Sequence, residues 1–149
     1  MKYSARIFFL TLLALIGTTT VRLYSQSANG GLKISVTGLR NNKGKVLLTL
    51  FNSEKGFPAS TSDAVFKAES LIKNGVATIV YDAIVNGEFA IAVMHDENNN
   101  QKMDTKMFGL PKEGYGFSND VMGTFGPPSF KKASFSYPAK KEVFIKMKY

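Results

Sequence analysis

The sequence predicts an all-β protein: an antiparallel β-sandwich of immunoglobulin-like or transthyretin-like type, with about seven strands and a long irregular flap loop. Two observations support this prediction. Short segments rich in β-branched and aromatic residues recur along the chain, and several alternate apolar with polar side chains as half-buried strands do. No segment between them has the apolar pattern of a strong helix, so helical and mixed folds are not favoured.

The N-terminal residues 1–27 are predicted to be a secretory signal peptide. Lys2 and Arg6 precede an apolar run at residues 7–17, and small residues follow it. The run is shorter than the roughly 20 residues that a membrane-spanning helix needs. We therefore expect export to the periplasm, the cell envelope or the outside, although an uncleaved membrane anchor is the alternative interpretation.

Cleavage after Ser27, or alternatively after Ser25, would leave a single domain at residues 28–149 with no transmembrane segment. Loss of the leader, which holds three basic residues and no acidic one, lowers the formal charge from +8 to +5. Arg40 is then the one arginine and the lysines are spread out, so nucleic-acid binding is not predicted. The charge suits either an anionic envelope surface or a coat of solvated lysines.

Strands are expected at residues 32–36, 45–51, 65–73, 76–82, 88–95, 133–137 and 142–148. The second of these is more apolar than the first and should be central. The fifth is apolar on both faces, which is typical of a buried strand. Asn74-Gly75 separates the third from the fourth and predicts a two-residue hairpin turn, because both positions tolerate positive φ angles.

The long segment at residues 96–130 shows no convincing strand or helix. A structureless stretch of that length is usually functional or disordered. Disorder is not favoured, because disordered segments are poor in aromatic residues and this one is rich in large apolar side chains: Phe108, Leu110, Tyr115, Phe117, Phe125 and Phe130. We expect a packed flap over one end of the sandwich. Its aromatic residues would either line a pocket for a glycan, peptide or lipid moiety or form the flap's own small core.

The start of the flap has the spacing of a cation-binding loop. Oxygen-bearing side chains stand at loop positions 1, 3, 5 and 9, at Asp96, Asn98, Asn100 and Asp104. The loop departs from an EF-hand, because Gln101 replaces the glycine of the sharp turn and Met107 replaces the closing glutamate. The sequence predicts a weak structural Ca²⁺ site; the alternative is that these side chains cap turns through the backbone.

Catalysis is not predicted, although one residue set would allow it. His95 is the only histidine and shares a strand face with apolar residues, so a satisfied histidine at the edge of the core is the simplest interpretation. The rival function is an envelope hydrolase in which His95 pairs with Asp96, Asp104 or Glu113 as an acid and base. Ser118 is not part of a nucleophile elbow, and the chain has no second histidine or cysteine for a zinc site.

Two strings in the sequence resemble a known family: Gly87 to Asn98 with Asn100 and Asp104, and Gly109 to Asn119. They are similar to exported bacterial proteins classified as domain of unknown function 2141, over the chain from about Leu32 to its end. The resemblance implies an envelope location and a small β-sandwich, and it implies no activity or substrate. Family members commonly have glycine where this chain has Asn99 and Gln101.

These observations predict an exported, non-catalytic binding or structural module of the bacterial envelope. Its partner would be a glycan, a peptide or a protein, and an inert structural domain without a ligand is a further reading. The residues expected to contact a ligand are those around the single histidine and the Gly-rich part of the flap: His95, Glu113, Tyr115, Phe117, Ser118 and Asn119.

Overall fold

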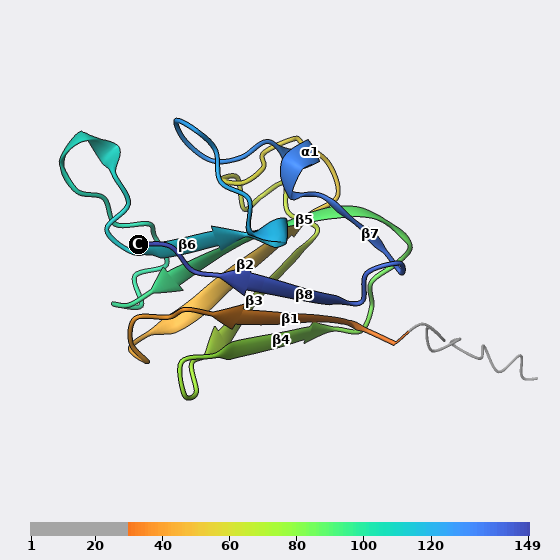
Figure 1. Ribbon diagram of the computed structural model, residues 1–149, viewed down its shortest axis with the longest axis horizontal. Coiled ribbons are helices and arrows are strands. Elements are labelled where there is room, and N and C mark those ends of the chain that lie inside the picture. Colours follow the sequence, from red (N-terminus) through yellow and green to blue (C-terminus); the bar gives the residue numbers. More distant parts are fainter. Residues whose placement is uncertain (1–29) are drawn as a thin grey trace, which may run out of the picture.

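The computed structural model describes residues 30–149, so the predicted signal peptide lies outside the described residues. Two β-sheets pack against each other (Figure 1), which confirms the predicted all-β sandwich. The three-stranded sheet has the order β4-β1-β8 and is formed by β1 (Leu32–Thr37), β4 (Ala77–Tyr81) and β8 (Glu142–Lys146). The five-stranded sheet runs β3-β2-β5-β6, with β7 also paired to β5; its strands are β2 (Lys45–Phe51), β3 (Phe66–Leu71), β5 (Gly87–Asp96), β6 (Gly114–Phe117) and β7 (Phe135–Tyr137).

The main core lies between the two sheets. Alternate residues of β1, β2 and β8 point inward, as the period of two in their sequences predicts. They meet the inward face of β5 in one continuous buried cluster that includes Ile34, Val36, Leu48, Leu50, Ile91, Val93, Val143 and Ile145. β5 is buried on its other face too, because the flap covers it. Within residues 30–149, no helix is long and apolar enough to cross a membrane.

The strand pairing differs from the prediction in two respects. β1 pairs with β8 in parallel, so the sandwich is not antiparallel throughout. The turn at Asn74-Gly75 forms as expected, with φ angles of 52° and 75°. However, the strands that it joins enter different sheets, since β3 pairs with β2 and β4 pairs with β1. Only Lys73 and Val76 bridge each other across the turn. The turn thus links the two sheets at one edge.

The flap contains more regular structure than the sequence suggests. It includes β6, which is not among the seven predicted strands. It also includes the 3-10 turns η1 (Met107–Gly109) and η2 (Ser118–Asp120) and the start of the short helix α1 (Phe130–Ala133). β6 extends the five-stranded sheet beside β5, with Met94 opposite Tyr115. Tyr115 also exchanges two backbone hydrogen bonds of 2.9 Å with Lys148, just beyond β8. β6 therefore joins the edges of the two sheets.

The apolar residues of the flap fall into two groups. Phe117 and Phe130 pack with Phe57 against Ala90 and the other small side chains on the outer face of β5, forming a second, smaller core. A second group stands in solvent: Met107, Phe108, Leu110, Met122 and Phe125 are exposed. The expected packed flap is present, but its tips are not part of its core.

Candidate functional site

His95 lies in β5 on the face that meets the three-stranded sheet, and its side chain is 0% exposed. Its Nε2 lies 2.8 Å from the carbonyl oxygen of Lys43, and its Nδ1 lies 2.6 Å from the hydroxyl of Tyr149. Because a carbonyl can only accept, Nε2 carries the hydrogen, and in the neutral imidazole Nδ1 accepts the hydroxyl hydrogen of Tyr149. Both ring nitrogens are thus engaged inside the protein.

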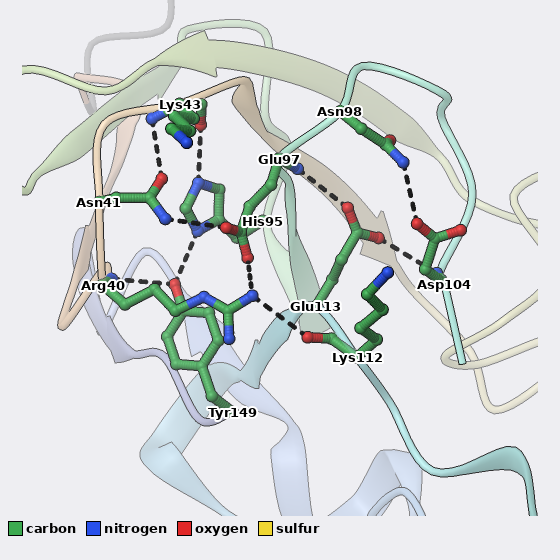
Figure 2. A network of polar contacts seen from close by, with 10 residues as sticks. All are labelled: Arg40, Asn41, Lys43, His95, Glu97, Asn98, Asp104, Lys112, Glu113 and Tyr149. Carbon is green, nitrogen blue, oxygen red and sulfur yellow. Dashed lines mark hydrogen bonds and ion pairs between the residues drawn. The ribbon is translucent and has the colours of Figure 1, made fainter. Parts of the chain in front are cut away.

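Tyr149, the last residue, connects His95 to a charged pair at the surface (Figure 2). Its hydroxyl accepts a 3.1 Å hydrogen bond from the backbone N–H of Arg40, whose guanidinium lies 4.5 Å from the centroid of the tyrosine ring. Arg40 also forms an ion pair with Glu97 and donates to the carbonyl of Lys112 at 3.3 Å. We call Arg40, Asn41, His95, Glu97 and Tyr149 the His95 network.

The electrostatics of the network favour an ionised Glu97. Burial raises the pKa of this carboxyl, but hydrogen bonds from Asn41 and Arg40, together with the charge of Arg40, outweigh it and bring the pKa below its ordinary value. Asn41 Nδ2 donates to Glu97 Oε2 at 2.8 Å. Burial, with the nearby Glu97 charge, raises the pKa of the Tyr149 hydroxyl. At neutral pH the Glu97 carboxylate therefore accepts hydrogen bonds, and the Tyr149 hydroxyl keeps the hydrogen that it donates to His95.

The loop after β5 is ordered by its own side chains. Asp96 accepts backbone hydrogen bonds from Asn100 at 3.0 Å and from Gln101 at 2.9 Å. The amides of Asn98 and Asn100 donate to the two oxygens of Asp104 at 2.9 and 3.1 Å. The side chains of Asn98, Asn100 and Asp104 thus meet one another, whereas the Asp96 carboxylate bonds to the backbone as a turn cap does. The cation site stays a prediction.

Glu113, which directly precedes β6, hydrogen-bonds to the same loop. Its side chain is buried, and its two oxygens accept the backbone N–H groups of Glu97 at 2.9 Å and of Asp104 at 3.1 Å. A carboxylate that accepts two backbone hydrogen bonds holds both ends of the loop at a fixed separation. Glu113 therefore positions the loop, and its oxygens are directed at the backbone.

The acid and base pairing considered for a hydrolase is not formed. His95 hydrogen-bonds to Tyr149 and Lys43, and among the described residues it makes no hydrogen bond to Asp96, Asp104 or Glu113. Within residues 30–149 no group of three or more His, Cys, Asp or Glu side chains is arranged to hold a metal ion. The Asp and Asn oxygens of the loop are the remaining candidates for a hard cation.

Ser118 and Asn119 fasten the flap to the sandwich. The buried Ser118 hydroxyl accepts from the Ile91 N–H at 2.9 Å and donates to the Ala133 carbonyl at 2.6 Å. Asn119 Nδ2 donates to the Ser134 carbonyl at 2.8 Å, and the residue has a φ of 63°. These two residues thus join β5 to the segment that contains α1.

The aromatic candidates pack rather than line a pocket. Phe117 is buried and lies edge-on to Phe57 and Tyr115, with ring centroids 6.1 and 6.0 Å apart. This agrees with the smaller core that was one of the two interpretations of the flap. A hollow of about 390 Å³ lies elsewhere, between Val65, Tyr81 and Phe89, and none of the predicted site residues lines it.

Sequence reasoning missed the partners that satisfy His95. Tyr149 stands at the chain terminus, where no motif marks it, and Asn41 reads as an ordinary turn residue. Arg40 carried a weak signal, because it is the single arginine after the predicted cleavage point. Gly44 precedes the second expected strand, and only the structure shows its role: its φ is +64°, and an added Cβ would lie 1.8 Å from the carbonyl oxygen of Asp96. Only glycine lets the two segments around His95 approach so closely.

Comparison with known proteins found one match. The model of a family described as "Uncharacterized protein conserved in bacteria", DUF2141, matches residues 34–145, which is more than half of the chain. The matched range includes every strand of the sandwich except the first residues of β1 and the last of β8. Neither the curated proteins nor the solved structures gave a match.

Proposed function

Because the chain belongs to the bacterial family DUF2141, whose description states no activity, we propose a function from its own geometry. The protein is an exported, non-catalytic binding module of the bacterial envelope that meets its partner through the flap. The export part of this proposal depends on the signal-like residues 1–27. The observation that carries the non-catalytic part is the complete burial of His95, with both nitrogens hydrogen-bonded internally.

The polar chemistry of the site supports a structural role. Within residues 30–149, no buried side-chain nitrogen or oxygen lacks a hydrogen-bond partner. A general base needs a free lone pair within hydrogen-bond reach of its substrate. His95, Glu113 and Ser118 all direct their polar atoms at the protein itself. A hydrolase would require these bonds to break before substrate could be engaged.

The flap supports a binding role because it is both held rigidly and exposed. Its base is fixed by Glu113, Ser118 and Asn119, whereas Phe108 at one tip is 94% exposed. Ordering a loop before binding lowers the entropy that is lost in the complex. A glycan, a peptide, a protein or a lipid surface would be met by the same tips.

A weak structural Ca²⁺ in the loop is part of this proposal. Asp96, Asn98, Asn100 and Asp104 lie in one loop, in which the last three meet through their side chains, and Asn side chains present either oxygen or nitrogen by rotation of the amide. Two carboxylates and two amides would give a Kd of about 10⁻⁴–10⁻³ M, typical of extracellular modules. The ion would tighten the base of the flap.

Co-sedimentation with the envelope tests the proposal. We would express the full-length wild type, His95→Gln and the double variant Phe108→Ser/Phe125→Ser in the parent bacterium, and measure the fraction of each protein that sediments with washed envelopes. The wild type and His95→Gln should sediment alike, and the flap variant should remain in the supernatant. Phe144→Ser is the matched control, because Phe144 is also exposed (60%) but lies on β8.

Two results would contradict the proposal. If the flap variant sediments like the wild type, the flap does not carry binding. If the purified wild type hydrolyses an ester, amide or glycoside substrate, and folded His95→Gln has lost that turnover, the protein is an enzyme. Circular dichroism of each variant establishes that it is folded before either result is interpreted.

A further inference from the structure

The segment of the flap around Phe108 is held in a defined shape by backbone hydrogen bonds. At its base the Lys112 N–H donates to the Asp104 carbonyl at 2.8 Å, and Thr105 bridges Pro111. Nearer the tip the Lys106 N–H donates to the Leu110 carbonyl at 2.7 Å. We call residues 105–112 the Phe108 finger. Its backbone hydrogen bonds determine where its apolar side chains stand.

The finger holds its apolar residues away from the protein. Met107, Phe108 and Leu110 are 78%, 94% and 61% exposed. Phe108 has a φ of 65°, in the left-handed region that L-residues with large side chains rarely adopt. Such strain is retained mainly at functional sites. The chain therefore bears a local cost that places an aromatic ring in solvent.

A second loop, residues 121–132, carries another exposed aromatic ring. Phe125 at its tip is fully exposed, and Met122 is also exposed. The turn is tight, because an added Cβ on Gly123 would lie 2.2 Å from the carbonyl oxygen of Gly126. We call this the Phe125 loop. Figure 1 shows both loops, in teal and blue, projecting from the same side of the sandwich.

The charged residues within the two loops are all lysines. The Phe108 finger contains Lys106 and Lys112, and the helix α1 that ends the Phe125 loop contains Lys131 and Lys132. Acidic residues are absent from both ranges and adjoin them at Asp104, Glu113 and Asp120. All four lysines are exposed, and none forms an ion pair within residues 30–149. Aromatic and apolar tips flanked by lysines match the layering of a bilayer, in which anionic headgroups surround an apolar interior.

We propose that the Phe108 finger and the Phe125 loop insert into the surface of an anionic lipid bilayer. This rests on the proposed function, in that it names the partner met by the flap. A convex tip with a single protruding ring buries little area against a rigid protein surface. A fluid bilayer deforms around it and takes up each apolar side chain separately. The lysines then contact lipid phosphates, and the attraction is weakened by salt.

The experiment uses a property of the whole sequence: it contains no tryptophan. Phe108→Trp therefore places the only indole at the tip of the finger. The exported Phe108→Trp protein is mixed with vesicles of phosphatidylcholine, with and without phosphatidylglycerol. Its emission should shift to the blue and be quenched by brominated acyl chains only when phosphatidylglycerol is present. Phe144→Trp on the outer face of β8 is the control and should show neither change.

A second pair of variants tests the electrostatic part. In the Phe108→Trp background, Lys106→Gln/Lys112→Gln should weaken binding to anionic vesicles by about 30-fold, since each lysine near such a surface contributes roughly fivefold. Lys67→Gln/Lys73→Gln removes two exposed lysines from β3 and the adjoining turn, at the edge of the five-stranded sheet opposite β6. This control should leave binding within about twofold of the parent.

The outcomes separate this inference from the proposed function. Unchanged Phe108→Trp emission on anionic vesicles, with envelope binding that still depends on Phe108 and Phe125, would overturn the lipid inference and identify a protein or glycan partner. Equal binding to vesicles without phosphatidylglycerol would also overturn it. If binding to the envelope does not depend on Phe108 and Phe125, the proposed function is overturned as well.

Discussion

Tyr149 joins three segments of the chain through one hydroxyl and one ring. The hydroxyl bonds to His95 and to the backbone of Arg40, and the ring supports the Arg40 guanidinium and occupies the space over Gly114. Because these contacts give the buried His95 a hydrogen-bond partner, Tyr149 contributes to the stability of the site.

The first prediction concerns that hydroxyl. Tyr149→Phe should lower the free energy of unfolding by about 1–3 kcal/mol, because it leaves His95 Nδ1 without a partner in a buried position. Urea unfolding measures the change. Tyr81→Phe is the control: its hydroxyl makes no hydrogen bond among the described residues, and its ring stays stacked on Phe66. Equal losses in the two variants would contradict the proposed role of Tyr149.

The second prediction concerns acid stability. Because the pKa of Glu97 is lowered in the folded protein, its ionised form stabilises the fold above the ordinary value of 4.5. That contribution should disappear as the pH falls below 4.5 and through the lower pKa of the folded state. Glu97→Gln should be less stable at neutral pH and lose less on acidification. Urea unfolding across this range tests it; parallel curves for both proteins would contradict it.

At the scale of elements, β6 depends on two glycines. An added Cβ would lie 2.5 Å from the Tyr149 ring at Gly114 and 2.7 Å from Ile145 Cγ2 at Gly116. Both glycines are needed because β6 passes directly beneath the C-terminal segment that it bridges. Glycine usually weakens a strand, and in this strand it permits the close approach that joins the two sheets.

The third prediction follows from this contact. Gly114→Ala should destabilise the protein by about 1–3 kcal/mol through overpacking against Tyr149. In the double variant Gly114→Ala/Tyr149→Ala the clash is absent, so the two losses should not add. A double-mutant cycle by chemical unfolding measures this coupling. Strict additivity would show that the alanine harms β6 for another reason, such as strand geometry.

The loop between β5 and β6 gives the fourth prediction. If Asp96, Asn98, Asn100 and Asp104 bind Ca²⁺ with a Kd near ~10⁻³ M, about 10 mM Ca²⁺ should stabilise the fold by roughly 1.4 kcal/mol. The melting temperature would then rise by about 3–6 °C. Mg²⁺ should have less effect, because it requires a tighter octahedron.

Asp96→Ala/Asp104→Ala provides the matched control for calcium. This variant should melt lower than the wild type, since both carboxylates accept hydrogen bonds in the loop, and its melting temperature should not respond to Ca²⁺. A wild-type melting temperature that is also unresponsive would show that these residues act as turn caps alone.

At the scale of the whole molecule, the flap makes the two edges of the sandwich unlike. One side carries the fixed base and exposed tips of the flap, and the Asn74-Gly75 turn lies at the opposite edge in Figure 1. An orientation of this kind suits a protein that meets a surface from one direction. The sheets themselves, with a shared buried core, form the rigid platform that this arrangement requires.

The fifth prediction concerns processing of the whole chain. The protein recovered from the envelope fraction should begin near Gln26 or Ala28, because the apolar run at residues 7–17 is followed by small residues. Intact mass spectrometry gives the N-terminus directly. Retention of Met1 would mean that the segment is not cleaved, and the membrane would then be reached through an anchor as well as through the flap.

The sequence by itself determined the class of fold and most of the strands. Period-two alternation in β1, β2 and β8, and the continuous apolar run of β5, depend on which side chains face the core, and that is a local property. The Asn74-Gly75 turn was predictable for the same reason, since its φ angles are set by the two residues themselves.

Only the tertiary structure decided how distant segments satisfy one another. β1 lies parallel to β8, and β6 can form because Gly114 and Gly116 leave room for Tyr149 and Ile145, which are distant in the sequence. The two ring nitrogens of His95 are hydrogen-bonded to Tyr149 and to the carbonyl of Lys43, and neither residue is near His95 in sequence. Hydrogen bonds and packing between remote residues leave no periodic trace along the chain. The division of the flap's aromatic residues into a buried group and an exposed group depends on those same contacts.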